Sequence, residues 1–307
     1  MREAELLKAI RDIFDSAAAK KSGLLVGNGD DGAIFSSAGK EVVVAADVAV
    51  EGIHFKGEWS SGFDIGRKIT AANLADICAM GGWPHFLLVT VVLPDRWVGQ
   101  ALEIAKGIAH EAFLVDAAVI GGDLSRGNEL SISITAIGYG EKRLLRSSAR
   151  VGDAVVISSI PGWSAAGLSM LKSGTKPVRD VEKRAVAEHK SPSIDYKKYR
   201  ANVEYLNAAI DVSDGLVTDA GHLARASKVS IDIDSRSLVS AELASIGEAE
   251  DWIRNGGEDH VLLATTSTPE LCPGMVVIGK VSQNSDGKVF IDGKEVHEAG
   301  FHHQWNE

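Results

Sequence analysis

The sequence predicts an α/β protein built from two domains. Its 307 residues are enough for two domains or for one large α/β unit. Segments with strand and helix periodicity alternate along the chain, and its 32 glycines indicate many tight turns. Charged and turn-forming residues gather in segment 141–153, as is typical of a domain boundary. We therefore expect one domain over residues 1–148 and a second over residues 149–307.

The first half is expected to combine a sheet with helices. A helix is predicted over 63–80, because Ser61 and Asp64 form a capping box before it and two glycines follow it. The other predicted elements are a helix over 4–17, a hairpin of strands 33–35 and 41–46 that ends at Asp47, strands over 85–93, 117–120 and 130–139, and a helix over 96–114.

The second half alternates strands and helices in the same way. Segment 161–167 opens a helix whose free backbone amides could seat an anion, and a capped packing helix explains the segment equally well. A helix over 216–226 follows a strand and an acidic loop. The other predicted elements are strands over 154–158, 208–210 and 261–264, a helix that ends at Gly256, and short strands over 276–305.

Aspartates recur where chemistry is expected. Each one lies at a strand end, in a glycine-containing loop or on the apolar helix 63–80; the set is Asp30, Asp31, Asp47, Asp76, Asp123, Asp211 and Asp214. Carboxylate oxygens with few histidine or cysteine neighbours suit Mg²⁺ better than zinc, copper or iron. Because Mg²⁺ commonly bridges substrate phosphates, the pattern predicts a cleft that binds a nucleoside triphosphate through metal ions.

Several other classes of protein conflict with the sequence. Segment 27–32 has the glycine spacing of a dinucleotide site, but a strand follows it instead of a helix, and its two aspartates would repel a pyrophosphate. P-loop and protein-kinase motifs are absent. The net charge of −10 argues against nucleic-acid and anionic-membrane surfaces, and no apolar run is long enough to span a bilayer. Cys78 and Cys272 suggest buried free thiols, and the cytoplasm is the expected compartment.

Six segments of the chain resemble the thiamine-monophosphate kinase family, which belongs to the superfamily of aminoimidazole ribonucleotide synthetase. They are Gly29-Asp30-Asp31-Gly32-Ala33, Asp47 through Glu51-Gly52-Ile53-His54-Phe55, Asn73-Leu74-Ala75-Asp76, Gly121-Gly122-Asp123 with Arg126, Asp211-Val212-Ser213-Asp214-Gly215-Leu216 and Gly256-Gly257-Glu258-Asp259. Their order and spacing match the family from about residue 25 to residue 301. The acidic turn is shared by the superfamily, whereas the segments at 51–55 and 256–259 are more specific to the kinase.

The resemblance implies a two-domain α/β (α+β) fold of the aminoimidazole ribonucleotide synthetase type. The mixed sheet of the N-terminal domain would help to form a homodimer barrel, and the C-terminal α/β domain would complete the cleft for ATP. The implied reaction transfers the γ-phosphoryl group of ATP directly to thiamine monophosphate, giving thiamine diphosphate, with several Mg²⁺ ions. By matching positions, Asp30, Asp47, Asp76, Asp123, Asp211, Asp214 and the backbone of Ala46 would bind metal; Gly122, Asp123, Arg146 and Ser213 would bind ATP; and His54, Glu258 and Phe301 would bind the acceptor.

The chain departs from the family pattern at four places. Ala45-Ala46 stand where hydroxyl residues are usual, Trp163 replaces an aspartate and His260 replaces a tyrosine. The Pro-punctuated, Arg-rich segment of the family appears only as Glu188-His189-Lys190-Ser191-Pro192. These changes bear on substrate contacts more than on the metal ligands, and a role for Asp31 as a ligand stays open. Two alternatives also stay open: another ATP-using enzyme of the superfamily with a different acceptor, and a non-catalytic module that binds a nucleotide or a divalent ion.

Overall fold

The computed structural model describes residues 24–26, 33–37, 39–140, 142–283 and 286–301. The predicted helix 4–17 and the residues Asp30 and Asp31 lie outside these ranges. Within them, no helix is both long enough and apolar enough to cross a membrane. Cys78 and Cys272 are buried free thiols, as expected.

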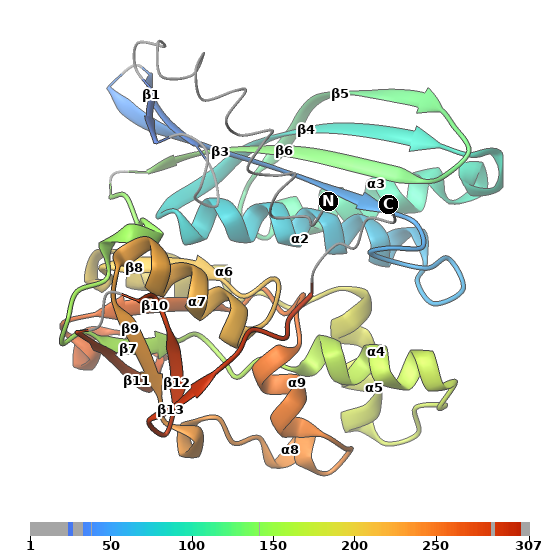
Figure 1. The fold of residues 1–307 in the computed structure, drawn as a ribbon. Helices are drawn as coiled ribbons and strands as arrows, with labels where there is room; N and C mark the ends of the chain where they lie inside the picture. Colours follow the sequence, from blue (N-terminus) through green and yellow to red (C-terminus); the bar gives the residue numbers. More distant parts are fainter. Residues whose placement is uncertain (1–23, 27–32, 38, 141, 284–285, 302–307) are drawn as a thin grey trace, which may run out of the picture.

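Residues 24–140 form a six-stranded mixed sheet in the order β1-β2-β3-β6-β4-β5 (Figure 1). Neighbouring strands are antiparallel except β4 and β5, which run parallel. The strands are β1 (Leu24–Val26), β2 (Ala33–Ser37), β3 (Lys40–Val50), β4 (Gly82–Leu93), β5 (Ala118–Arg126) and β6 (Ser131–Gly140).

Residues 154–296 form a second sheet of seven strands in the order β13-β12-β9-β11-β7-β10-β8. Its neighbours are antiparallel except β9 and β12. The strands are β7 (Ala154–Ile157), β8 (Ala208–Asp211), β9 (Ser230–Ile233), β10 (Leu262–Thr266), β11 (Val276–Ser282), β12 (Val289–Ile291) and β13 (Lys294–Val296).

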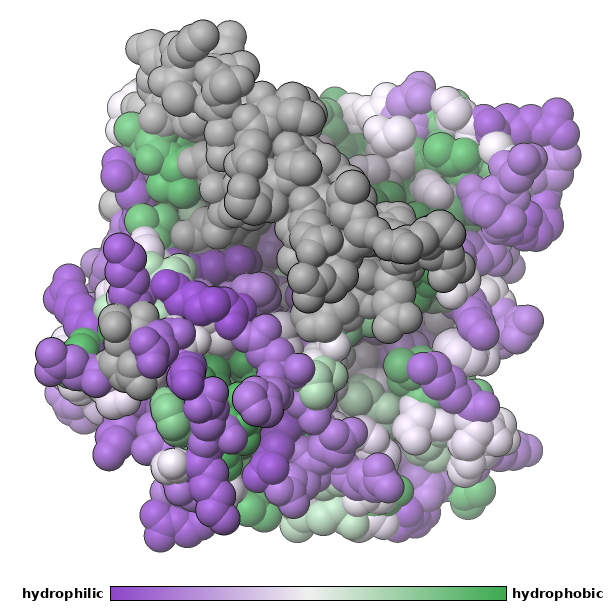
Figure 2. All heavy atoms as spheres, viewed as in Figure 1, coloured by the Kyte–Doolittle hydropathy of each residue, from purple (hydrophilic) through white to green (hydrophobic). Residues whose placement is uncertain are grey.

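The described helices connect and cover the two sheets. They are α2 (Gly62–Ala79), α3 (Ala101–Phe113), α4 (Trp163–Ser173), α5 (Asp180–Lys190), α6 (Tyr196–Asn202), α7 (Leu216–Ser227), α8 (Ala241–Ala244) and α9 (Ala249–Asn255). Short 3-10 turns are η1 (Asp95–Gln100), η2 (Arg146–Ser148), η3 (Val203–Tyr205), η4 (Ser235–Ser237) and η5 (Pro269–Leu271). Polar side chains cover most of the C-terminal half that faces the viewer in Figure 2.

Helix α2 packs against both halves of the chain (Figure 1). It begins at the predicted capping box, in which Ser61 accepts from the Asp64 amide and the Asp64 carboxylate accepts from the Ser61 amide. Leu74 and Ile77 of α2 are fully buried in one hydrophobic cluster with residues of the first sheet and of the second half. The members from the second half include Val156, Tyr196, Tyr199, Ala209 and Leu262. The two halves therefore share part of one core.

Two glycines allow α2 and α3 to approach closely. A Cβ atom on Gly66 of α2 would lie 2.2 Å from the carbonyl oxygen of Ile104, and one on Gly107 of α3 would lie 2.1 Å from that of Phe63. Both contacts are with backbone atoms, so a side-chain rotation cannot relieve them. The spacing between these helices therefore depends on glycine at both positions.

Replacing Gly66 or Gly107 with alanine is expected to lower the free energy of unfolding by about 1–3 kcal/mol, because overpacking outweighs the better helix propensity of alanine. Gly99 provides the control, since a Cβ atom there meets nothing within 4 Å. Urea unfolding of the three variants measures the difference. Equal stability of Gly66→Ala and Gly99→Ala would contradict the prediction.

Several predicted elements have wrong boundaries, and three of the differences are large. Strand β3 continues through Asp47 to Val50, because each of its residues from Glu41 to Val50 pairs with β6. Strand β5 continues through segment 121–123 to Arg126, because it pairs with β4 along this length, so the predicted acidic loop is part of a strand. The predicted helix 96–114 starts as the 3-10 turn η1 before it becomes α3.

Candidate active site

Three of the predicted metal ligands lie near one another between the two halves of the chain, although their ligand atoms are not all within 4.8 Å of one another. Asp47 lies in β3, Asp76 lies on α2, and Asp211 is the last residue of β8. The Asn73 side chain joins the first two elements, because its Oδ1 accepts a hydrogen bond of 3.1 Å from the amide of Asp47. Asn73 and Asp76 therefore share the helix face that the sequence indicated, and this face turns toward β3.

The electrostatics of this group favour a bound cation. Burial raises the pKa of Asp47 above its ordinary value, and the charge of Asp211 raises it further, while His260 and a hydrogen bond with Asp76 act in the opposite direction. Raised pKa values follow when carboxylates repel each other away from water. A divalent cation would remove that penalty, so these oxygen ligands fit Mg²⁺ by their chemistry.

Asp211 is buried and fixed by a histidine. Its Oδ2 lies 2.8 Å from Nδ1 of His260, and the carbonyl of His260 accepts from the Tyr199 hydroxyl. Burial alone would lower the pKa of His260, but the hydrogen bond and the charge of Asp211 raise it above its ordinary value. His260, which stands where the family has a tyrosine, therefore donates to a predicted metal ligand.

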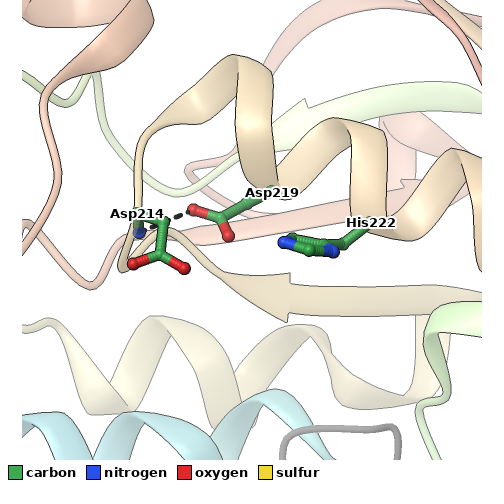
Figure 3. A group of neighbouring side chains, drawn as sticks. All are labelled: Asp214, Asp219 and His222. Carbon is green, nitrogen blue, oxygen red and sulfur yellow. Dashed lines mark hydrogen bonds between the residues drawn. The ribbon is translucent and has the colours of Figure 1, made fainter. Parts of the chain in front are cut away.

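A second acidic group lies at the start of α7 (Figure 3). Asp214 precedes the helix, while Asp219 and His222 lie on it, and their ligand atoms lie within 4.8 Å of one another. Burial raises the pKa of Asp219 well above its ordinary value, and the charges of Asp214 and Asp211 add to this. Asp219 also accepts hydrogen bonds from the amides of Asp214 and Gly215, of 3.0 and 3.1 Å. It thus shapes the loop that carries Asp214.

Segment 256–260 is fastened to the loop after β8. The amide of Glu258 donates to the carbonyl of Ser213 at 2.8 Å, and that of His260 donates to Val212 at 2.9 Å. Glu258 and His260 have positive φ values of 65° and 48°, a conformation that costs non-glycine residues about 1–2 kcal/mol each. Neighbouring bonds must hold this arrangement, as is common at functional sites.

The start of α4 is a capped packing helix. The amides of Gly162 and Ser164 donate to the two carboxylate oxygens of Asp259, at 2.8 and 3.1 Å. Burial raises the pKa of Asp259 to about 6, although these two hydrogen bonds act against it. The Asp259 carboxylate therefore occupies the amides of Gly162 and Ser164, which favours the capped packing helix over an anion site.

Other predicted site residues lie beside α7 or in the loop after β3. Arg146 lies in η2 beside α7, and its charge lowers the pKa of Asp219. The amide of Phe301, a half-exposed residue, donates to the carbonyl of Asp214 at 3.1 Å. His54 accepts at Nδ1 from the amide of Val50 at 3.0 Å, just beyond the part of β3 that carries Ala46 and Asp47.

Gly122 and Asp123 lie apart from this group within one chain. The register places Asp47, Ile134, Val89 and Gly122 in one row across β3, β6, β4 and β5. Three strand spacings therefore separate Asp47 from Gly122, which is roughly 14 Å. Side chains alternate along a strand, so Asp123 projects from the opposite face of the sheet to Asp47. Asp123 is exposed, and its carboxylate accepts from the Ser125 hydroxyl at 3.0 Å.

Sequence reasoning missed the buried basic residues Lys68 and His189 beside Glu258. Nζ of Lys68 lies 2.9 Å from Oε2 of Glu258, and Nδ1 of His189 lies 3.7 Å from the same oxygen. Lys68 is on α2 at a position that the apolar spacing marks as buried, which was the available signal. For Asp219 the signal was an acidic residue in the first turn of a helix.

His189 should make folding sensitive to acid. Burial, and secondly the charge of Lys68, lower its pKa from 6.5 to about 4. The unfolded chain therefore takes up this proton first, and up to about 3 kcal/mol of stability is lost as the pH falls through that window. We expect His189→Gln to lose less stability than the wild type between pH 6.5 and 4 in denaturant titrations. The exposed His85→Gln control should behave as the wild type, and equal slopes for all three proteins would contradict the assignment.

Known proteins resemble the whole chain. Residues 29–139 match the family of AIR synthase related protein, N-terminal domain. Thiamine-monophosphate kinase of Mycobacterium tuberculosis is 34% identical over 283 residues, which is 89% of this chain and 83% of the relative. That of Bacillus subtilis is 37% identical over 255 residues, 80% and 78% of the two chains. The solved structure of AaThiL complexed with AMPPCP and TMP has a TM-score of 0.89 at 30% identity, covering 99% of this chain and 97% of that one.

The similarity covers both sheets and extends over the segments that carry Asp47, Asp76, Asp211 and Glu258. Identities of this size over most of both chains establish common membership. The chain therefore belongs to the thiamine-monophosphate kinase family.

Proposed function

We propose that this protein transfers the γ-phosphoryl group of ATP to thiamine monophosphate, producing thiamine diphosphate and ADP. The observation that carries the proposal is that Asp47 has both Asp76 and Asp211 as electrostatic neighbours between the two halves, while the Glu258 amide is hydrogen-bonded to the loop after β8. Such an arrangement suits two anionic substrates that must be brought together. The names of the relatives and the phosphate-rich ligands of the solved AaThiL structure point to the same reaction.

The reaction needs positioning more than a protein nucleophile. A phosphate oxygen of thiamine monophosphate forms a bond to the γ-phosphorus, and the bond from this phosphorus to the β,γ-bridging oxygen breaks, releasing ADP. We assign metal binding to Asp30, Asp47, Asp76, Asp123, Asp211, Asp214 and the Ala46 backbone, ATP contacts to Gly122, Asp123, Arg146 and Ser213, and acceptor contacts to His54, Glu258 and Phe301. Bound Mg²⁺ would screen the repulsion between the phosphates and align them.

An exposed sheet edge supports a homodimer. Strand β5 ends the first sheet among the described residues, and Ile120 and Leu124 on it are 56% and 66% exposed (Figure 1). An apolar edge strand of this length normally pairs or is covered. We propose that a second copy covers it, closing the barrel. Asp123 and Gly122 would then join the cleft of the partner subunit, which accounts for their separation from Asp47.

The dimer has a direct test. Ile120→Lys is expected to convert a dimer into monomers in light scattering at micromolar concentration, because it places a charge in an apolar interface. Leu102→Lys, on an exposed turn of α3, is the matched control and should stay dimeric. A monomeric wild-type protein would overturn the homodimer proposal.

Chromatography of the products tests the reaction. The protein is incubated with Mg-ATP and thiamine monophosphate, and thiamine diphosphate and ADP are expected in equal amounts. Formation of ADP only with another phosphate acceptor would reassign the acceptor. Binding of ATP without turnover would favour a non-catalytic module.

A further inference from the structure

Lys68 places a buried ammonium group at the junction of the two halves. The residue is 7% exposed. Its Nζ donates to the carbonyl of His54 at 3.1 Å and to that of His189 at 3.1 Å, and it lies 2.9 Å from Oε2 of Glu258. An ammonium group has three N–H donors, and these three contacts use all of them. Lys68 is therefore fully occupied by this protein and has no donor left for a substrate.

The two residues that Lys68 joins come from different halves of the chain. His54 follows β3, whereas Glu258 follows α9 and precedes β10. Both are assigned to acceptor binding, and one side chain fixes the backbone of the first and the carboxylate of the second. Burial would raise the pKa of Glu258, but the charge and the hydrogen bond of Lys68 lower it below its ordinary value, so the group is an anion at neutral pH. His189 itself is neutral there, since its pKa is lowered to about 4.

Glu258 keeps one oxygen available. Its side chain is 32% exposed, and its contacts with Lys68 and His189 both involve Oε2. Within the described ranges, Oε1 makes no hydrogen bond. The backbone of Glu258 has a positive φ and is held by Ser213, so the direction of the carboxylate depends on the side-chain contacts. Lys68 therefore determines where Oε1 points.

We propose that Lys68 is a positioning residue for the acceptor substrate, holding Glu258 and the His54 loop in one arrangement across the two halves. The inference rests on the proposed function, because it assigns Lys68 to the acceptor side of that reaction. A lysine needed only for folding would affect ATP and acceptor alike. A positioning residue affects the acceptor, because its contacts reach His54 and Glu258.

Steady-state kinetics separate these roles. Lys68→Met is expected to raise the KM for thiamine monophosphate by about tenfold or more, while the KM for ATP changes by less than about twofold. Lys68→Gln should also raise the KM for thiamine monophosphate without changing that for ATP. This variant serves if Lys68→Met does not fold, because the glutamine amide can still donate to the two carbonyls. Lys68→Arg, which keeps the charge, should recover part of the acceptor KM. Lys106→Met, on the exposed face of α3, is the matched control and should match the wild type.

A double-mutant cycle adds a readout that a structural role would not move. If Lys68 acts through Glu258, Lys68→Gln should raise the acceptor KM much less in a Glu258→Gln background than in the wild type. Fully additive effects of the two substitutions would overturn the inference, and so would an unchanged acceptor KM in both Lys68→Met and Lys68→Gln. In either case, turnover by the wild-type protein would still support the proposed function. A wild-type protein that forms no thiamine diphosphate would overturn the proposed function and this inference with it.

Discussion

Replacing Asp47 or Asp211 with asparagine is expected to reduce kcat by about 10²- to 10³-fold while the protein stays folded. The amide keeps the size of the side chain but removes the negative charge that would hold a cation against the phosphates. Asp47 and Asp211 come from different halves, and the charge of Asp211 raises the pKa of Asp47, so each change should affect the same bound ion. Product analysis at saturating ATP and limiting Mg²⁺ measures the loss.

In the metal-free protein, Asp47→Asn should increase the stability of the fold, although it lowers turnover. Because the pKa of Asp47 is raised, the folded state binds this proton more tightly than the unfolded state, and charging the group as the pH rises weakens folding. Asp47→Asn should therefore raise the melting temperature of the metal-free protein at pH 7. Asp180→Asn, at a fully exposed position, is the control for both measurements. Near-normal turnover of Asp47→Asn at limiting Mg²⁺ would refute the assignment.

Removing Mg²⁺ should abolish thiamine diphosphate formation and destabilise the protein. The carboxylates of the site repel one another, and burial and the charges of Asp214 and Asp211 hold the pKa of Asp219 well above its usual value. A cation that binds only the folded state stabilises it by about 2.7 kcal/mol at a concentration of one hundred times Kd. Chelation followed by readdition of MgCl₂ should therefore lower and then restore both activity and melting temperature.

The size of this thermal shift should depend on the predicted ligands. Asp47→Asn and Asp211→Asn are expected to show a smaller shift with MgCl₂ than the wild type, whereas Asp180→Asn should show the full shift. Calcium chloride provides a comparison with MgCl₂ in the same thermal-shift measurement. Ca²⁺ also binds carboxylates, but its ligand distances are longer and its coordination geometry is more variable than those of Mg²⁺. If no divalent cation changes the melting temperature of the wild-type protein, the proposed metal site is contradicted.

Local sequence signals predicted much of the fold. The capping box of Ser61 and Asp64 and the apolar spacing after it predicted α2 within a residue at either end. The predicted ends of elements were wrong where contacts with neighbouring strands determine how far an element extends. Strand β5 passes through Gly121-Gly122-Asp123 because the glycine backbone lies against β4: a Cβ atom on Gly122 would lie 1.8 Å from the carbonyl oxygen of Val89. Nothing local in the sequence distinguishes this from a turn.

In the candidate site, too, local signals were predictable from the sequence and tertiary contacts were not. Asp47, Asp76 and Asp211 were recognisable as a set because hard oxygen ligands are unusual next to buried strands and on an apolar helix face. The contacts that hold the site could not be recognised from the sequence, because Lys68, His189 and Glu258 come together only through tertiary packing. His260 was noticed as a departure from the family, but its hydrogen bond to Asp211 depends on the antiparallel pairing of β8 with β10.

The position of α2 limits how the site can open. Leu74 and Ile77 of this helix are fully buried in a cluster that includes residues of both halves. Swinging the halves apart as rigid bodies would expose such side chains at a cost of about 1.5–3 kcal/mol each. We therefore expect substrates to enter and leave through smaller local movements and not through a hinge between the two sheets.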